Sequence, residues 1–247
     1  MNLALVSLVR NRGVVEWKRT VREILLRERN KLYELAVRKR LLTIRGGLFW
    51  DIGASIGFYS FCLRKNFEKI VAIEPNPRTA YMLRRRVKFC LVRNIDVKQV
   101  ALSNCRGWLP LYSQREWRAR PGVGNLIAGI SYLYSSDSLL SRFEYRSARD
   151  LSGKSDKVRE HRPNLRVWAE RFDDLVTGPV ELVKIDVEGA EFLVLDGMRK
   201  SLRTSLIGNI LVELHDRDNK TRLESILSSY DYTVEWADPE HLLATAP

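Results

Sequence analysis

The first chemically informative residues form the pattern Asp51-x-Gly53-x-x-x-Gly57, directly after an apolar run. Glycines permit a tight turn and let a ligand approach the main chain closely. A dinucleotide pyrophosphate would favour a Gly-x-Gly-x-x-Gly turn without an acid, because the helix N-terminus behind the turn has to receive negative charge. An acid at position 51 suits instead a ligand that carries a cationic ammonium and a sulfonium.

Glu74 lies at the end of the next β-rich run, 17 residues after Gly57. A carboxylate at this place can accept hydrogen bonds from both hydroxyls of a ribose. Asn76 and Pro77 follow, where Asn76 can cap a helix and Pro77 can occupy its first turn. Together with the glycine turn, these residues favour S-adenosylmethionine over a nicotinamide cofactor.

Three charged side chains alternate in a later apolar segment, at Lys184, Asp186 and Glu188. They project to one side if the extended geometry of a strand continues through them. Charges so placed are costly in a buried sheet unless they pair or act on a ligand, so a structural network of ion pairs is the alternative to catalysis.

If the methyl acceptor is a hydroxyl, it also has to lose its proton, and Asp186, Glu188 and His215 are then the candidate general bases. His215 can equally be a hydrogen-bonded structural residue. Asp186, Glu213 and His215 also combine oxygen and nitrogen ligands for a divalent cation. Because these residues show no defined ligand spacing, and the three cysteines form no Cys-x-x-Cys pair, we predict no metal site.

Apolar runs alternate with segments of helical period along most of the chain, which predicts an α/β fold. This alternation is typical of a mostly parallel sheet with helices on both faces, whose ligands lie at the carboxyl ends of the strands. The runs indicate strands at 48–52, 69–73, 97–102, 109–112, 180–186, 207–214 and 232–236. The helical periods indicate helices at 14–43, from 58 onward, and at 77–91, 190–202 and 221–229.

The chain divides into an extension and one domain. Residues 1–46 form a basic amphipathic helical extension that ends at Gly46 and Gly47, and its apolar stripe is expected to dock on the rest of the protein. Residues 47–247 form the domain. Within it, residues 113–166 lose periodicity and gain Gly and Ser, which makes them a candidate lid or substrate-binding insertion.

The motifs occur in three blocks, at 49–59 (Phe-Trp-Asp-Ile-Gly-Ala-Ser-Ile-Gly-Phe-Tyr), 72–76 (Ala-Ile-Glu-Pro-Asn) and 184–191 (Lys-Ile-Asp-Val-Glu-Gly-Ala-Glu). In content and order they resemble the FkbM family of S-adenosylmethionine-dependent methyltransferases. The block Asp-x-Glu-Gly-Ala-Glu is the most specific of them. Further similar segments lie at 100–103, 172–175 and 210–215, so the resemblance extends from about residue 48 to 236.

The resemblance implies a class I methyltransferase fold, which is Rossmann-like, with seven strands in the order 3-2-1-4-5-7-6. It also implies S-adenosylmethionine as the methyl donor and O-methylation of a hydroxyl in a sugar, glycan or small natural product. By position, Glu74 would bind the ribose, and Asn76 and Ala101 would lie near the adenosine. Catalytic candidates facing the acceptor would be Asp186 and Glu188, with Lys184 and His215. The methionine part would be held by Asp51, Gly53, Ala54, Ser55 and Gly57.

Charge is distributed unevenly around the formal net charge of +12. Residues 1–48 contain twelve basic and four acidic side chains, whereas residues 172–247 contain seven and fifteen. A basic first half attracts anionic partners, so an RNA methyltransferase that tracks phosphates is one alternative and peripheral contact with an anionic membrane is another. Solvated helix faces would explain the charge without a partner. A non-catalytic binding protein on the same fold is the remaining alternative.

No apolar run reaches the roughly 20 residues that a membrane-spanning helix needs, and the N-terminus lacks the features of a signal peptide. We therefore expect a cytoplasmic protein without a transmembrane segment. The three cysteines are expected to be small buried residues in a reducing compartment. His161 and His241 stand in no motif and are expected at the surface.

Overall fold

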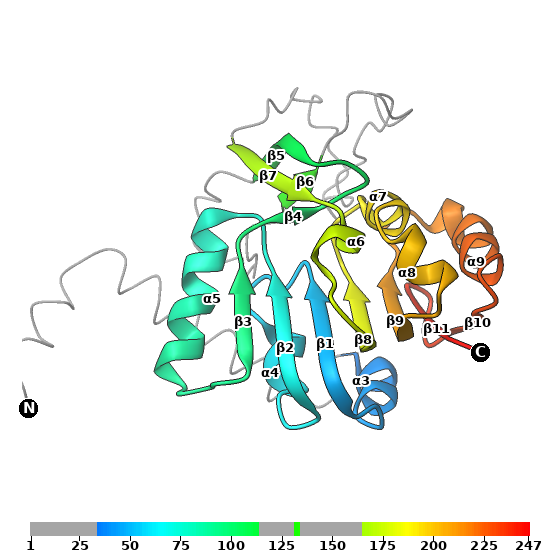
Figure 1. Ribbon diagram of the computed structural model, residues 1–247, viewed down its shortest axis with the longest axis horizontal. Helices are drawn as coiled ribbons and strands as arrows, with labels where there is room; N and C mark the ends of the chain where they lie inside the picture. Colours follow the sequence, from blue (N-terminus) through cyan, green and yellow to red (C-terminus); the bar gives the residue numbers. More distant parts are fainter. Residues whose placement is uncertain (1–33, 114–130, 134–164) are drawn as a thin grey trace, which may run out of the picture.

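Seven strands form the central sheet, in the order β10-β11-β9-β8-β1-β2-β3 (Figure 1). The computed structural model describes residues 34–113, 131–133 and 165–247. Renumbered along the chain within this sheet, the order is 3-2-1-4-5-7-6, which confirms the expected topology. Neighbouring strands from β3 to β9 are parallel, and β11 is antiparallel to both of its neighbours. The strands are β1 Gly46–Ile52, β2 Phe67–Ile73, β3 Ile95–Lys98, β8 Val180–Ile185, β9 Ile207–Glu213, β10 Thr233–Trp236 and β11 His241–Thr245.

Helices cover both faces of this sheet, because alternate apolar side chains of its strands point to opposite sides. Trp50 and Ile52 of β1 belong to one core cluster, which also includes buried side chains of α6, α7, α8 and α9. Phe49 of the same strand belongs to the other cluster, with α3, α4 and α5. The helices are α3 Leu35–Leu41, α4 Phe58–Cys62, α5 Pro77–Phe89, α6 Phe172–Leu175, α7 Glu191–Asp196, α8 Arg199–Arg203 and α9 Lys220–Ser228, with a 3-10 turn at Arg217–Asn219.

The predicted helix at 14–43 lies outside the described residues up to residue 33. Its last part is α3, which buries Val37 and Leu41 in the cluster around Phe49, so this part of the apolar stripe does dock on the sheet. The helix stops at Leu41, and Gly46 and Gly47 begin β1 instead of closing the helix. None of the helices within the described ranges has the length and apolarity needed to cross a membrane.

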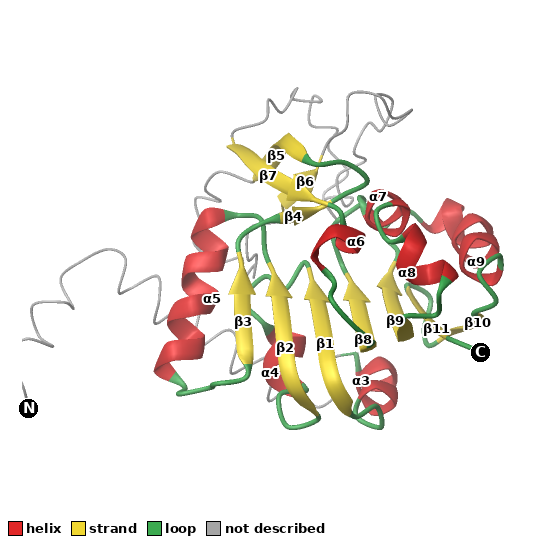
Figure 2. Ribbon diagram, viewed as in Figure 1, coloured by secondary structure: helices red, strands yellow, loops and turns green. Residues whose placement is uncertain are grey.

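A second sheet of order β4-β7-β5-β6 lies beyond the carboxyl ends of the central strands (Figure 2). The predicted strand at 97–102 is divided, because the chain leaves the central sheet after β3 and continues in β4. Apart from the end of β5, β6 and the start of β7, the 113–166 interval lies outside the described residues, so its function as a lid stays a prediction. The strands are β4 Ala101–Leu102, β5 Gly107–Ser113, β6 Ser131–Leu133 and β7 Leu165–Glu170.

Other expectations about single residues and elements were wrong. The predicted helix at 190–202 is two helices, and a side chain at Gly197 between them would meet the backbone oxygen of Ser103. Cys90 and Cys105 are exposed rather than buried, while Cys62 is half-buried. His241 is buried, because it begins β11, a strand that the short apolar run at 242–244 did not reveal. His161 lies outside the described residues.

Candidate active site

The turn after β1 brings the candidate cofactor-binding residues against the end of β8. Gly53 has a φ of +78°, and a Cβ atom there would stand 1.6 Å from the backbone oxygen of Asp186. The left-handed φ and the close contact with the Asp186 backbone both require glycine at position 53. The N–H groups of Gly53 and Ala54 donate to the carbonyl oxygen of Ile73 at 3.0 and 2.9 Å. The turn is thereby tied to the carboxyl end of β2, where the ribose-binding candidate follows.

Glu74 connects the loops after β1 and β2. Its Oε2 accepts a hydrogen bond from the backbone N–H of Ser55 at 2.9 Å, and its Oε1 accepts one from that of Asn76 at 2.8 Å. Burial raises the pKa of Glu74 to about 7, although these two hydrogen bonds act in the opposite direction. Each carboxylate oxygen can accept more than one hydrogen bond, so the arrangement fits recognition of two ribose hydroxyls.

Asp51 is the second-last residue of β1, and its side chain lies on the face covered by α3 and α4. It is 1% exposed, and its Oδ2 accepts hydrogen bonds from the backbone N–H of Ser60 at 2.9 Å and from the Ser60 hydroxyl at 2.5 Å. Burial raises the pKa of Asp51, and nearby Lys184 opposes this rise. Asp51 therefore stands at the predicted place, already oriented by the helix that follows the turn.

The remaining cofactor candidates border the same ends of the strands. Asn76 caps α5, since its Oδ1 accepts hydrogen bonds from the N–H groups of Arg78 and Thr79 at 3.0 and 3.4 Å. Gly57 has a φ of +81° and directly precedes α4 as its N-cap residue. Ala101 is buried in β4. The cap on α5 that the sequence predicts is thus confirmed.

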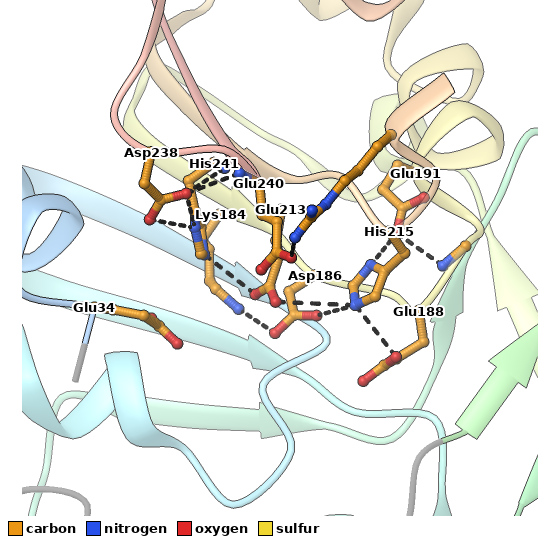
Figure 3. Close-up of polar contacts among 12 residues, drawn as sticks. Glu34, Lys184, Asp186, Glu188, Glu191, Glu213, His215, Asp238, Glu240 and His241 are labelled. Atoms are coloured by element: carbon orange, nitrogen blue, oxygen red, sulfur yellow. Dashed lines mark hydrogen bonds and ion pairs between the residues drawn. The ribbon is translucent and has the colours of Figure 1, made fainter. Parts of the chain in front are cut away.

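His215 lies at the centre of a group of carboxylates after β8 and β9 (Figure 3). Its Nδ1 is 2.9 Å from Glu191 Oε1, and its Nε2 is 3.2 Å from Glu188 Oε2 and 3.8 Å from Asp186 Oδ1. Burial lowers the pKa of His215, but the contacts with Glu188 and Glu191 outweigh burial and raise it to about 11. At neutral pH His215 is therefore a cation that holds these carboxylates together.

Lys184 binds Asp186 from the opposite side, with 2.6 Å between Nζ and Oδ2. Burial opposes the charge of this ammonium, but Asp186 and Glu213 raise the pKa of Lys184 above its usual value. Burial raises the pKa of Asp186, but the Lys184 ammonium outweighs burial and lowers this pKa below its usual value. The Lys184 ammonium also lies 4.8 Å from the centre of the Tyr59 ring in α4.

The structure gathers Lys184, Asp186, Glu188 and His215 as expected, but not by a continued strand. β8 ends at Ile185, and Glu188 has a left-handed φ of 55°. Sequence reasoning assigned no function to Glu191, which is buried and accepts a hydrogen bond from the N–H of Gly189 at 2.8 Å. The sequence signal that could have identified Glu191 as a site residue was its place at the end of the Asp-x-Glu-Gly-Ala-Glu block.

The sheet order, the glycine turn after the first strand and the buried carboxylate after the second define a class I methyltransferase that uses S-adenosylmethionine. The sequence profile of the Methyltransferase FkbM domain matches residues 51–234. The chain belongs to this family of methyltransferases, as its motifs indicated.

Curated relatives and a solved structure agree with this assignment. The chain is 25% identical over 215 residues to Methyltransferase sdnD of Sordaria araneosa, covering 79% of each chain. It is 26% identical over 205 residues to Methyltransferase 1 of Beauveria bassiana, covering 77% of this chain and 76% of the relative. The crystal structure of Methyltransferase FkbM from Methylobacillus flagellatus KT shares the fold, with a TM-score of 0.51 and 15% identity. That match covers 81% of this chain but only 43% of the Methylobacillus chain.

Proposed function

We propose that this methyltransferase acts on oxygen, transferring the methyl group to a hydroxyl of a sugar, glycan or small natural product. The observation that carries the proposal is the pair of partly exposed carboxylates, Asp186 and Glu188, at the end of β8 next to the Gly53 turn. Carboxylates can take up the proton of a hydroxyl acceptor. A cytoplasmic location and contacts with nucleic acid or membranes stay predictions.

The residues present fit the methyl donor. Gly53 lets the loop after β1 pass close to the backbone of Asp186, which a side chain would prevent. Glu74 presents a buried carboxylate that can accept further hydrogen bonds. Asp51 would act on the ammonium of the donor, Glu74 on its ribose, and Asn76 and Ala101 would border the adenosine. The methionine part would also contact the turn at Gly53, Ala54, Ser55 and Gly57.

Bound S-adenosylmethionine supplies an electrophilic methyl carbon on its sulfonium. The protein then mainly aligns the acceptor and excludes water, because the transfer is a direct displacement. Asp186 or Glu188 takes up the hydroxyl proton. His215 and Lys184 are already protonated, so they act by fixing these two carboxylates rather than as bases.

The Asp186→Asn variant tests this assignment. A positioned general base contributes roughly 10²- to 10⁴-fold to the rate, so we expect turnover to fall by about that factor. Donor affinity should change less than about threefold, since Asp186 is assigned to the acceptor. The measurement is transfer of a labelled methyl group to a panel of hydroxyl acceptors, with donor binding followed by calorimetry. Asp196→Asn in α7 is a matched control, and retained turnover in Asp186→Asn would remove Asp186 from the chemistry.

A further inference from the structure

Three further side chains of ligand type meet on the α3 side of the sheet (Figure 3). Glu34 directly precedes α3, Glu213 ends β9, and His241 begins β11. The pairing of β11 with β9 sets His241 opposite Glu213. One oxygen or nitrogen atom from each of the three side chains lies within 4.8 Å of the others. Residues far apart in the sequence thus bring two carboxylates and an imidazole to one place.

The His241 side chain is 4% exposed and is oriented from its Nδ1 side. Nδ1 lies 2.8 Å from Asp238 Oδ1, an oxygen that also accepts hydrogen bonds from the N–H groups of Glu240 and His241. Nε2 is buried without a hydrogen-bond partner, although Glu213 Oε2 is 3.4 Å away. A carboxylate on one ring nitrogen is the common partner of a metal-binding histidine, because it directs the other nitrogen toward the metal.

Like charges on the two carboxylates repel each other, so a cation between them would stabilise both. The ammonium of Lys184 on neighbouring β8 is already bound to Asp186. Glu34 is held in place by the Tyr59 hydroxyl, which donates a hydrogen bond to its Oε2. The site therefore combines two held ligands, Glu34 and His241, with the Glu213 carboxylate around a place suited to a cation.

We propose that Glu34, Glu213 and His241 bind one divalent transition-metal ion, Mn²⁺ or Zn²⁺, which fastens the start of α3 to the ends of β9 and β11. One nitrogen and two oxygen ligands suit these ions better than Mg²⁺ or Ca²⁺, which prefer oxygen alone. Ligands at about 2.1 Å from an ion are at most about 4.2 Å apart, so small side-chain rotations complete the site. This inference goes beyond methyl transfer and departs from the sequence expectation of no metal.

The neighbouring group of Asp186, Glu188 and His215 also has ligand-type side chains within 4.8 Å of one another. It does not carry the proposal, because it belongs to the candidate active site already described and its His215 Nε2 lies 3.2 Å from Glu188 Oε2, whereas His241 Nε2 has no hydrogen-bond partner. The two groups can be distinguished by substitution.

Equilibrium dialysis of the full chain against MnCl₂ or ZnCl₂, followed by metal analysis, tests the proposal. We expect one equivalent of metal, and at least tenfold weaker binding in both His241→Ala and Glu34→Gln. Glu34→Gln keeps the test valid if His241→Ala fails to fold, because Glu34 lies outside the core. Bound metal should also raise the Tm of the native chain and leave that of Glu34→Gln unchanged.

Two control variants complete the experiment. Glu240→Gln removes an exposed carboxylate of the same hairpin, and Glu188→Gln alters the neighbouring group, so neither should weaken metal binding. The proposal is overturned if the folded native chain retains no metal, or if Glu34→Gln binds it as tightly as the native chain. It is equally overturned if Glu188→Gln is the substitution that abolishes binding. None of these results depends on methyl transfer or on donor binding.

Discussion

His215 is surrounded by four carboxylates, of which Glu191 and Glu188 are nearest and Asp186 and Glu213 lie within 3.9 Å of its Nε2. Glu191 is almost fully buried, so its charge needs a partner. The imidazolium supplies that partner and holds the two carboxylates assigned to the acceptor. His215 is therefore a positioning residue, and of the two functions that the sequence left open we favour the structural one.

The stability of the protein should depend on pH through His215. Its pKa is about 6.5 in the unfolded chain and is raised to about 11 in the folded one, so the folded state binds this proton more tightly. The stabilisation is complete below pH 6.5 and is lost as the pH rises toward 11. Between pH 7 and 10, the free energy of unfolding should fall by up to about 1 kcal/mol per pH unit more in the native chain than in His215→Gln.

Urea unfolding at a series of pH values measures this difference, with His215→Gln as the reference that shares every other titrating group. Parallel pH profiles for the two proteins would show that His215 is not the cation of the group. In that case Glu191 would need another explanation for its burial.

At the scale of elements, the site depends on where the loops after β1, β2 and β8 cross. Gly53 allows the first loop to pass over the backbone at Asp186, and Glu74 fastens the first loop to the second. The helices that follow the loops after β1 and β8, α4 and α7, are short, so the loops themselves set the positions of the functional side chains. A change at the crossing should therefore disturb donor and acceptor residues together.

The Gly53→Ala variant should show this coupling. Its Cβ atom would stand 1.6 Å from the Asp186 backbone oxygen, and its φ of +78° is unfavourable for alanine, so one of the two loops has to move. We expect a loss of stability of about 2 kcal/mol or more and at least tenfold weaker donor binding. Gly178→Ala is the matched control, because a Cβ atom at that position has open space around it. Donor binding at the native level in Gly53→Ala would show that the crossing does not shape the site.

At the scale of the whole molecule, the central parallel strands were predictable, because apolar runs are local signals. Their order followed only from the resemblance to the FkbM family, because the pairing of strands that are distant in sequence leaves no local signal. The last strand, β11, was missed since its apolar run is short and its partner, β9, is distant in sequence. The burial of His241 follows from that pairing and could not be predicted without it. The cofactor candidates could be read from the motifs, whereas the contacts of His215 with Glu188 and Glu191 depend on the left-handed turn at Glu188.

The most direct test of the account is a calorimetric titration of the purified protein with S-adenosylmethionine, with NAD in parallel. The native chain and the control Glu68→Ala, which alters an exposed carboxylate of β2, should bind S-adenosylmethionine at micromolar concentrations and should not bind NAD. Glu74→Ala should bind it at least tenfold more weakly, because the ribose loses its acceptor. Unchanged affinity in folded Glu74→Ala, or binding of NAD instead, would contradict the site described for this methyltransferase.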